Sequence, residues 1–469
     1  MLVEMTHTLP QAGGNMSRLG RTRFKRAASV APLIVGVAAL IGCSERATAP
    51  VSATSLAISA ASADRRDGDQ GAGAAATLAW EKTTRDLVVS HKVIPIVATR
   101  LYALHSMAVY AAVAAVGRGG DDGDDGRRGA TNATRRGAIA GASVQLLSAI
   151  MSDAAPGLQA QLAAYGQAES GRANTEFARG VEIGRAASNV MVAWATNDGF
   201  SLAWDESMRN PSGVGIWEGA AAVAPAARPA PAGYQYPAMR PYFLKSRHDQ
   251  TAQSQFRAPP PPVYLGDRFN TDLAEVKNIA LTRTQAQTDI ANVWNLAAGT
   301  ISTLGHWNEQ AAMFIAERGL DEQEASHLFA LLNAATMDAT IGCWDTKYHF
   351  LMLRPTMADP TIKLATGLPG FPYTLPNHPS YPSGHSCLSS SAVTILSHYF
   401  PTHAAALNAA LIEAGLSRIY GGIHYRFDIE AGQALGRSTA EWAIAYDRRH
   451  GALAALELGE HEDRERDRR

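Results

Sequence analysis

Long uncharged apolar stretches are scarce in this chain of 469 residues. A membrane-spanning helix needs about 20 predominantly apolar residues. Beyond the N-terminus, the most apolar long stretch, 87–116, is interrupted by His91, Lys92, Arg100 and His105. We therefore expect packed helix here, and we do not expect a protein with several membrane spans.

An excess of charge of either sign is also absent, and cysteine is rare. Lys and Arg total 42 and Asp and Glu total 43, which gives a formal net charge of -1. Nothing in this balance suggests a nucleic-acid partner, so small molecules or ions are expected. Apart from Cys43, the cysteines are Cys343 and Cys387. These two either form a disulfide, as an oxidising compartment permits, or remain two buried thiols.

The first 43 residues have the composition of an export signal. A basic stretch at 18–26 precedes an apolar run at 27–41, and the sequence Leu40-Ile41-Gly42-Cys43 follows. We predict a lipoprotein-type signal peptide at 1–43, because its end resembles a bacterial lipobox, in which Cys43 becomes the lipidated first residue. An ordinary signal peptide or a short anchor is the alternative. In each case the protein is exported, either periplasmic or held at a membrane only through its N-terminal lipid.

Composition divides the rest of the chain. Residues 44–76 are rich in Ala, Ser, Gly and Asp and predict a disordered tether. Residues 77–265 are expected to form a helical region that ends in an irregular, proline-rich connector. Residues 266–450 form the predicted catalytic domain, and 451–469 a charged tail.

Helical periodicity dominates between these breaks. Apolar residues recur at spacings of three and four in several stretches, and no alternating run bounded by hairpin turns is found. The clearest helical stretches are 138–151, 158–167, 175–196, 284–298, 310–318, 322–341 and 388–399. We predict an all-α fold of two helical bundles, with the active site in the C-terminal bundle.

Three short blocks near the C-terminus carry the chemistry. In the first, Lys347 and Arg354 are seven residues apart, which is two helical turns, so both are expected on one face of a helix. Pro355 should end that helix. In the second, the turn Ser383-Gly384-His385 opens an apolar run, which predicts a helix N-terminus that attracts anions.

The third block places a histidine beside a carboxylate. Gly421 and Gly422 should break the chain between Arg418 and His424, and Asp428 lies four residues beyond His424. Such an aspartate accepts the proton of one ring nitrogen and leaves the other nitrogen facing a ligand. Lysine and arginine side chains around it favour a phosphate-like dianion or trianion.

Together the three blocks resemble the signature of the PAP2 and vanadium-dependent haloperoxidase superfamily, namely K-x6-RP, PSGH and SR-x5-H-x3-D, without a substitution. The resemblance implies that an oxyanion is held by Lys347, Arg354, Ser383, Gly384 and Arg418. It further implies that His424 is the apical residue, His385 the general acid and Asp428 the group that orients His424. Vanadate resembles the transition state of phosphoryl transfer, so this signature fits two chemistries.

Wider context is similar to soluble bacterial vanadium haloperoxidases, over about residues 80–447. That branch implies a vanadate cofactor coordinated by His424, with halide and hydrogen peroxide as substrates. His378 resembles the halide-side residue of the bromide-oxidising type, which favours bromide or iodide over chloride. The alternative is a secreted acid phosphatase that needs no cofactor, acts on phosphate esters and forms phospho-His424, with His385 as general acid. A non-catalytic anion binder is a third possibility, but it would need neither His385 nor Asp428.

Overall fold

The computed structural model describes residues 73–118, 132–208, 212–219, 229–244 and 256–452. All of them belong to one unit of the chain, residues 68–469. The predicted signal peptide with Cys43, nearly all of the predicted tether and the tail beyond residue 452 lie outside the described residues.

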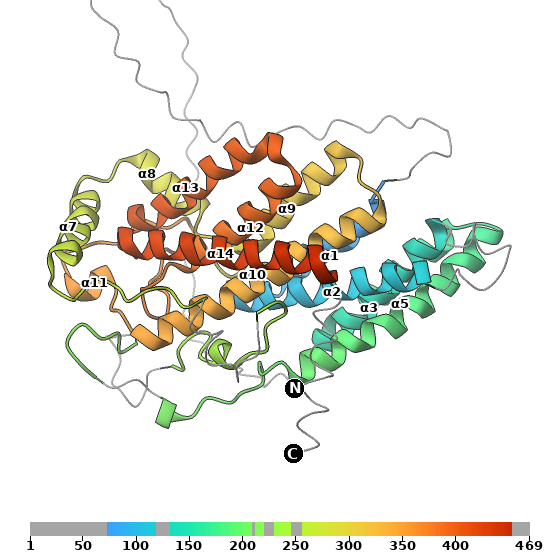
Figure 1. Cartoon of the computed structure of the whole chain (residues 1–469), viewed down its shortest axis with the longest axis horizontal. Helices are drawn as coiled ribbons and strands as arrows, with labels where there is room; N and C mark the ends of the chain where they lie inside the picture. Colours follow the sequence, from blue (N-terminus) through green and yellow to red (C-terminus); the bar gives the residue numbers. More distant parts are fainter. Residues whose placement is uncertain (1–72, 119–131, 209–211, 220–228, 245–255, 453–469) are drawn as a thin grey trace, which may run out of the picture. The chain divides into compact units, whose positions relative to one another are not determined.

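Helices make up almost all regular structure of the described residues, which contain no β-strand and only isolated bridges (Figure 1). The α-helices are α1 (Ala75–Ser90), α2 (Pro95–Arg118), α3 (Asn132–Ile150), α4 (Ala155–Ala168), α5 (Arg172–Asn197), α7 (Asp267–Thr282), α8 (Gln285–Val293), α9 (Ser302–Arg318), α10 (Glu322–Phe350), α11 (Pro355–Ala358), α12 (Gly384–Tyr399), α13 (Ala404–Tyr420) and α14 (Arg426–His450). Short 3-10 turns lie at Ser152–Ala154, Glu206–Met208, Tyr236–Ala238 and Pro401–His403. The predicted all-α class is confirmed.

Two predicted helical stretches differ from the structure in extent. The stretch 284–298 is helical only to Val293, because the backbone then enters left-handed conformations at Leu296 (φ 43°) and Gly299 (φ 89°). The apolar stretch 87–116 is divided between α1 and α2 by a turn at 91–94. By length and composition alone, the described segment Pro95–Gly117 could cross a membrane, but 83% of its most apolar window is buried. It packs as a core helix.

Glycines bring α3 and α5 unusually close together. A Cβ atom on Gly141 would lie 2.2 Å from the carbonyl oxygen of Val181, and one on Gly184 would lie 2.0 Å from that of Ala138. These distances are far below any normal contact, so only glycine permits this approach. The two helices lie side by side in Figure 1.

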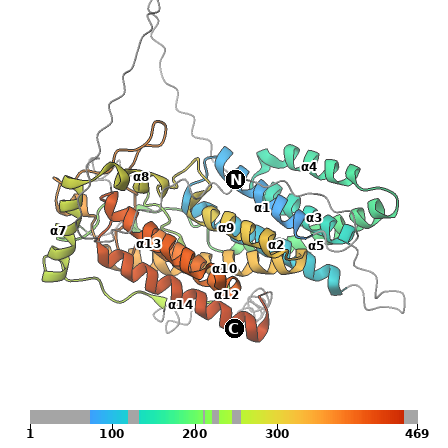
Figure 2. The same ribbon diagram turned by 90° about the horizontal axis from the view of Figure 1, so that it is seen from above.

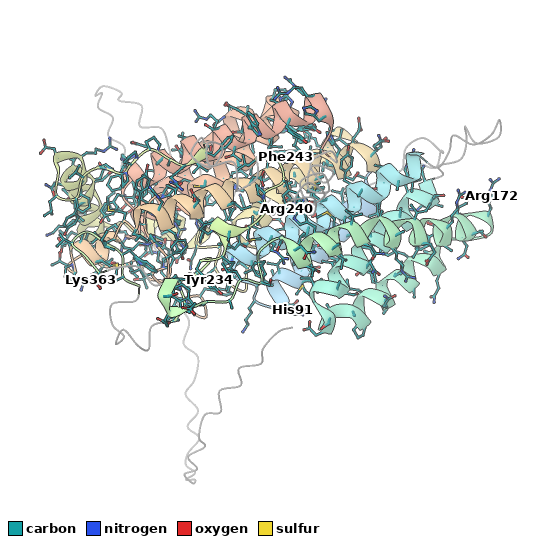
Figure 3. All side chains as sticks on the ribbon, turned by 60° about the horizontal axis from the view of Figure 1, so that its bottom comes forward. His91, Arg172, Tyr234, Arg240, Phe243 and Lys363 are labelled. Atoms are coloured by element: carbon teal, nitrogen blue, oxygen red, sulfur yellow. The ribbon has the colours of Figure 1, made fainter. Side chains whose placement is uncertain are left out.

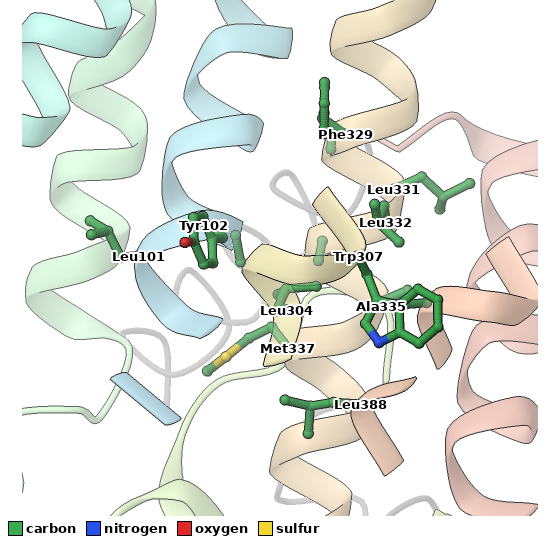
Figure 4. Packing of buried hydrophobic residues seen from close by; sticks show 14 of the residues in the cluster. Leu101, Tyr102, Leu304, Trp307, Phe329, Leu331, Leu332, Ala335, Met337 and Leu388 are labelled. Atoms are coloured by element: carbon green, nitrogen blue, oxygen red, sulfur yellow. The ribbon is translucent and has the colours of Figure 1, made fainter. Parts of the chain in front are cut away.

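The core is centred on α10, which is buried along most of its length. A capping box starts this helix: the Asp321 side chain accepts the backbone N–H of Glu324, and the Glu324 side chain accepts that of Asp321. Side chains from four helices meet here (Figure 4), including Tyr102 of α2, Trp307 of α9 and Leu388 of α12. Helices from both halves of the sequence therefore share one hydrophobic core.

The described connector segment 229–244 is fastened to this core (Figure 3). The buried carboxylate of Asp338, on α10, accepts the backbone N–H groups of Tyr242, Phe243 and Leu244 at 2.7, 2.6 and 3.0 Å. The indole of Trp442, on α14, donates to the carbonyl of Phe243 at 3.0 Å. The connector thus lies between helices that are far apart in the sequence.

Helix α12 lies beside both α13 and α14 (Figure 2). The contact between α12 and α14 is as close as that between α3 and α5. A Cβ atom on Gly436 would lie 2.2 Å from the carbonyl oxygen of Cys387. This approach holds the start of α12 against the first half of α14. The second sequence block lies at the start of α12, and the third block ends in the first turn of α14.

Candidate active site

Lys347 lies in the last turn of α10 and is completely buried. Its ammonium group donates to the carbonyl oxygens of Pro379 at 3.0 Å and Ser380 at 2.9 Å, and also to that of Pro382. Burial lowers the pKa of Lys347 to about 8. The lysine therefore joins the end of α10 to the loop that leads into α12.

Arg354 does not share a helix face with Lys347, so that prediction is wrong. Helix α10 ends at Phe350, and Leu351 is left-handed with φ 55°. Met352 then pairs with Ile216 of the segment 212–219. Arg354 becomes the N-cap of the short helix α11, whose first residue is Pro355. The prediction that Pro355 ends the first helix is also wrong, because α10 already ends at Phe350 and Pro355 is the first residue of α11.

This extended segment nevertheless brings Arg354 into the site. The guanidinium is fully buried and donates to the carbonyl of Ile423 at 2.8 Å and to Nε2 of His424 at 3.1 Å. Its other terminal nitrogen lies 3.0 Å from Nδ1 of His378. Burial lowers the pKa of Arg354 to about 10, so it remains a cation at neutral pH.

The second block forms a helix N-terminus, as predicted. Ser383 is the N-cap of α12, and its side chain accepts the backbone N–H of Ser386. The backbone N–H of Ser383 donates to the carbonyl of Asp428 at 2.8 Å. A Cβ atom on Gly384 would lie 3.2 Å from the indole of Trp344, so the indole closes one side of this turn.

The third block pairs His424 with Asp428, also as predicted. Nδ1 of His424 lies 2.8 Å from Oδ2 of Asp428, which also accepts from the Ser380 hydroxyl at 2.6 Å. Because Arg354 donates to Nε2 of His424, the ring carries its proton on Nδ1 and a lone pair on Nε2. Burial and the charge of Arg354 hold the pKa of His424 well below its usual range, so the ring is neutral.

His385 and Arg418 converge on one oxygen atom. Nε2 of His385 lies 2.8 Å from the carbonyl oxygen of Trp294, and Nη1 of Arg418 donates to the same oxygen at 2.6 Å. The two side chains are 3.3 Å apart. Burial and the nearby Arg418 hold the pKa of His385 well below its usual range, so it is neutral and donates through Nε2.

The sequence did not reveal the parts played by Ser380 and Trp294. Ser380 donates a hydroxyl hydrogen bond to the carboxylate that orients His424, and Trp294 supplies a backbone carbonyl at the turn after α8. A backbone acceptor leaves no trace in residue type. Ser380 lies three residues before Ser383 of the second block, but the residues around Ser380 form no motif that would identify it as a site residue.

The electrostatic character of the site fits an oxyanion. Lys347, Arg354 and Arg418 bring three positive charges against the single carboxylate of Asp428, and the four are at most 2% exposed. Among the described residues, Nε of Arg418 is buried without a hydrogen-bond partner. An unsatisfied guanidinium N–H in a closed site suits an acceptor oxygen. A tetrahedral dianion such as vanadate or phosphate therefore matches these donors.

Comparison with known proteins agrees with this geometry. Residues 325–451 match the family model of the PAP2 superfamily, and this range includes every site residue predicted from the sequence. We call this matched range, residues 325–451, the PAP2 domain.

The fold around the PAP2 domain is that of bacterial vanadium-dependent haloperoxidases. The crystal structure of a bacterial vanadium-dependent iodoperoxidase superposes with a TM-score of 0.63 at 21% identity, covering 81% of this chain and 98% of that one. The apo form of a bacterial vanadium-dependent chloroperoxidase gives 0.59 at 16% identity, covering 77% and 95%. The likeness extends well beyond the PAP2 domain into the N-terminal helices.

Sequence comparison finds a phosphatase as well. A non-specific acid phosphatase of Salmonella typhimurium is 30% identical over 106 residues. The match covers 23% of this chain and 41% of the phosphatase. The chain is thus similar in fold to the haloperoxidases and, over 106 residues, in sequence to an acid phosphatase.

The cysteines of the PAP2 domain lie together behind the site. Cys343 on α10 and Cys387 on α12 are buried, with their sulfur atoms 2.6 Å apart. This separation is longer than a disulfide bond and shorter than an ordinary contact between thiols, so it leaves both alternatives open, a disulfide and a pair of buried thiols.

Proposed function

We propose that this protein is a vanadate-dependent haloperoxidase that oxidises halide with hydrogen peroxide, bromide or iodide in preference to chloride. The observation that carries the proposal is the enclosure of the anion-binding side chains. Lys347 and Arg354 are completely buried, and Arg418 is 2% exposed. Such a site suits an inorganic anion that stays bound over many turnovers better than a phosphate ester that must enter and leave each time.

The fold comparison supports the same choice. This chain covers 98% of the iodoperoxidase and 95% of the chloroperoxidase, so the likeness of fold extends over nearly the whole of both proteins. The acid phosphatase match covers only 106 residues.

Each site residue has a role in this proposal. Lys347, Arg354, Ser383, Gly384 and Arg418 would hold the oxygens of vanadate, with His424 as its protein ligand through Nε2. Bound vanadate supplies a Lewis acid that activates hydrogen peroxide toward halide. The protein's own contribution is to keep His424 neutral and to exclude water from the anion.

Two further histidines would act on the reactants. His385 is neutral and lies 3.3 Å from Arg418, so it would first accept a proton and then deliver that proton as general acid. His378 lies against Arg354 and 5.1 Å, between ring centroids, from Trp344. We assign it to the halide side of the site, where it would influence halide preference.

An acid phosphatase is the second candidate. The lone pair on Nε2 of His424, fixed by the hydrogen bond from Nδ1 to Asp428, is equally suited to attack phosphorus. In that case His424 would be phosphorylated, His385 would protonate the leaving alcohol, and no cofactor would be needed. The 30% identity with the Salmonella typhimurium phosphatase supports this candidate.

We also propose that the protein is exported. The predicted signal at 1–43 would direct the protein to the periplasm, or Cys43 would anchor it to a membrane through lipid. From the composition and motifs of the sequence we propose a helical region at 77–265 and a catalytic domain at 266–450.

The deciding experiment uses the purified full-length protein, stripped of metal and bound anions and divided into two samples. One sample receives orthovanadate and is assayed for oxidation of bromide and iodide by hydrogen peroxide. The other receives a chromogenic phosphate ester. Halide oxidation that requires vanadate supports the haloperoxidase. Ester hydrolysis that vanadate inhibits, without halide oxidation, would replace it with the phosphatase.

Two variants make the result specific to the site. His424→Ala should abolish turnover in either chemistry, because it removes the ligand or nucleophile. His349→Ala is the matched control, since His349 lies exposed near Lys347 on α10. A fully active His424→Ala variant would refute both candidates.

A further inference from the structure

Tyr373 is a buried tyrosine whose hydroxyl has no hydrogen-bond partner among the described residues. It lies in the loop between α11 and α12, is 7% exposed, and belongs to none of the three sequence blocks. Among the other tyrosines of the described residues, the buried Tyr425 hydroxyl also lacks a partner, whereas those of Tyr102 and Tyr348 have acceptors. The Tyr102 hydroxyl donates to the carbonyl of Ile301 at 2.9 Å, and that of Tyr348 to the carbonyl of Ala232 at 2.8 Å.

The unpartnered hydroxyl lies at the turn that carries the third block. A Cβ atom on Gly421 would lie 2.0 Å from it, so any other residue at 421 would collide with the phenol. Gly421 stands between Arg418 and His424. The sequence thus combines a tyrosine with the single residue type that lets its hydroxyl reach this turn.

Positive charge surrounds the phenol. The guanidinium carbon of Arg418 is 5.5 Å from the centroid of the Tyr373 ring. Burial raises the pKa of Tyr373, while the charges of Arg418, Arg283 and Arg354 oppose that rise. The group is therefore a neutral O–H donor at neutral pH, and none of these three cations can accept a hydrogen bond from it.

Two buried donors in contacting side chains thus lack an acceptor: the Tyr373 hydroxyl and Nε of Arg418. Leaving a buried donor unsatisfied is unfavourable, whereas phenylalanine would fill the same space without that cost. A shared anion would satisfy both donors.

We propose that Tyr373 is a further anion-binding residue, whose hydroxyl donates a hydrogen bond to an oxygen of the tetrahedral oxyanion held by Arg418 and His424. The inference rests on the oxyanion site of the proposed function and holds for vanadate and phosphate alike. It adds a neutral donor from the α11–α12 loop to the charged donors of the three blocks.

The test compares Tyr373→Phe with the wild type as full-length proteins stripped of bound anions. Orthovanadate and inorganic phosphate are titrated separately by calorimetry, and thermal unfolding is measured without anion. A hydrogen bond to a charged acceptor is worth about a tenfold to a hundredfold in affinity, so Tyr373→Phe should bind both anions that much more weakly. Its unfolding temperature without anion should equal or exceed that of the wild type.

Tyr102→Phe is the matched control, because it removes an equally buried hydroxyl that does have an acceptor. It should lower the unfolding temperature and leave anion affinity unchanged. The opposite pattern in the two variants separates anion binding from a structural role.

Three outcomes would overturn the inference. Wild-type affinity in Tyr373→Phe would remove Tyr373 from the site while leaving the site intact. A loss of stability in Tyr373→Phe as large as that in Tyr102→Phe would assign its hydroxyl a structural partner. If the wild type binds neither anion, the proposed function fails as well, which the wild-type titration shows on its own.

Discussion

Replacing Asp428 with asparagine should weaken the hydrogen bond that orients His424 and fixes its tautomer, although the side chain hardly changes in shape. Oδ2 of Asp428 accepts hydrogen bonds from Nδ1 of His424 at 2.8 Å, the Ser380 hydroxyl at 2.6 Å and the backbone N–H of Tyr425 at 3.2 Å. Its Oδ1 has no partner among the described residues. An asparagine has one carbonyl oxygen, so its amide must face either these donors or the unpartnered side.

The two orientations of the asparagine amide predict losses of activity of different size. If the amide oxygen keeps the three donors, the variant leaves a buried NH2 group unsatisfied, which costs about 1–3 kcal/mol of folding stability. The hydrogen bond from Nδ1 of His424 to a neutral amide is also weaker than one to a carboxylate, by about 1–1.5 kcal/mol, so turnover or anion affinity should fall roughly tenfold. If the amide nitrogen faces His424, the ring must carry its proton on Nε2. A loss of about four orders of magnitude then follows, as in enzymes whose histidine is held in the wrong tautomer.

Nitrogen NMR of histidine-labelled protein distinguishes these cases, because the shifts of Nδ1 and Nε2 report which nitrogen is protonated. Turnover and orthovanadate affinity are measured on the same samples. Asp345→Asn is the control, since the Asp345 carboxylate pairs with Arg257 at 2.7 Å and has no role in the proposed site. Unchanged turnover in Asp428→Asn, with Nε2 of His424 still unprotonated and anion affinity unaltered, would refute the assigned role of Asp428.

Further predictions concern charge, packing and redox state. Burial lowers the pKa of Lys347 to about 8, so its charge is present below that pH and lost above it; orthovanadate affinity, titrated on both sides of pH 8, should fall on the alkaline side. In Gly432→Ala the new Cβ would lie 2.7 Å from the N-cap carbonyl oxygen of α12, and chemical denaturation should show a loss of about 1–3 kcal/mol. Gly117→Ala, with no atom within 4 Å of its Cβ, should not lose stability. The sulfurs of Cys343 and Cys387 are 2.6 Å apart, so mild oxidation should remove two hydrogens from the intact mass measured under non-reducing conditions; an unchanged mass would identify them as buried thiols.

The composition of the site could be read from the sequence because its members occur in short blocks with fixed spacing. The pair His424 and Asp428 needs only a helix start to come into contact, and the N-cap at Ser383 follows from local turn chemistry. These features depend on neighbours within a few residues. The structure places them as the spacing indicates.

Arg354 shows where this reasoning ends. Its seven-residue spacing from Lys347 fits two helical turns, but Leu351 adopts a left-handed conformation and Met352 pairs with Ile216. That pairing joins residues more than a hundred positions apart, so no local pattern could reveal it. Tyr373 could not be predicted from a local pattern either, because its hydroxyl occupies the space that a Cβ atom on the distant Gly421 would fill.

The hydrogen bonds from the connector to Asp338 limit how this protein can be divided. The family model begins at residue 325, yet Asp338 lies inside it and takes its donors from residues 242–244. A fragment cut at the family boundary would leave this carboxylate in an apolar interior without its three N–H groups. It would also lose α2, which contributes Tyr102 to the shared core. The range matched by the family model is therefore smaller than the range that completes the core. Truncation experiments should keep the chain from α1 onward.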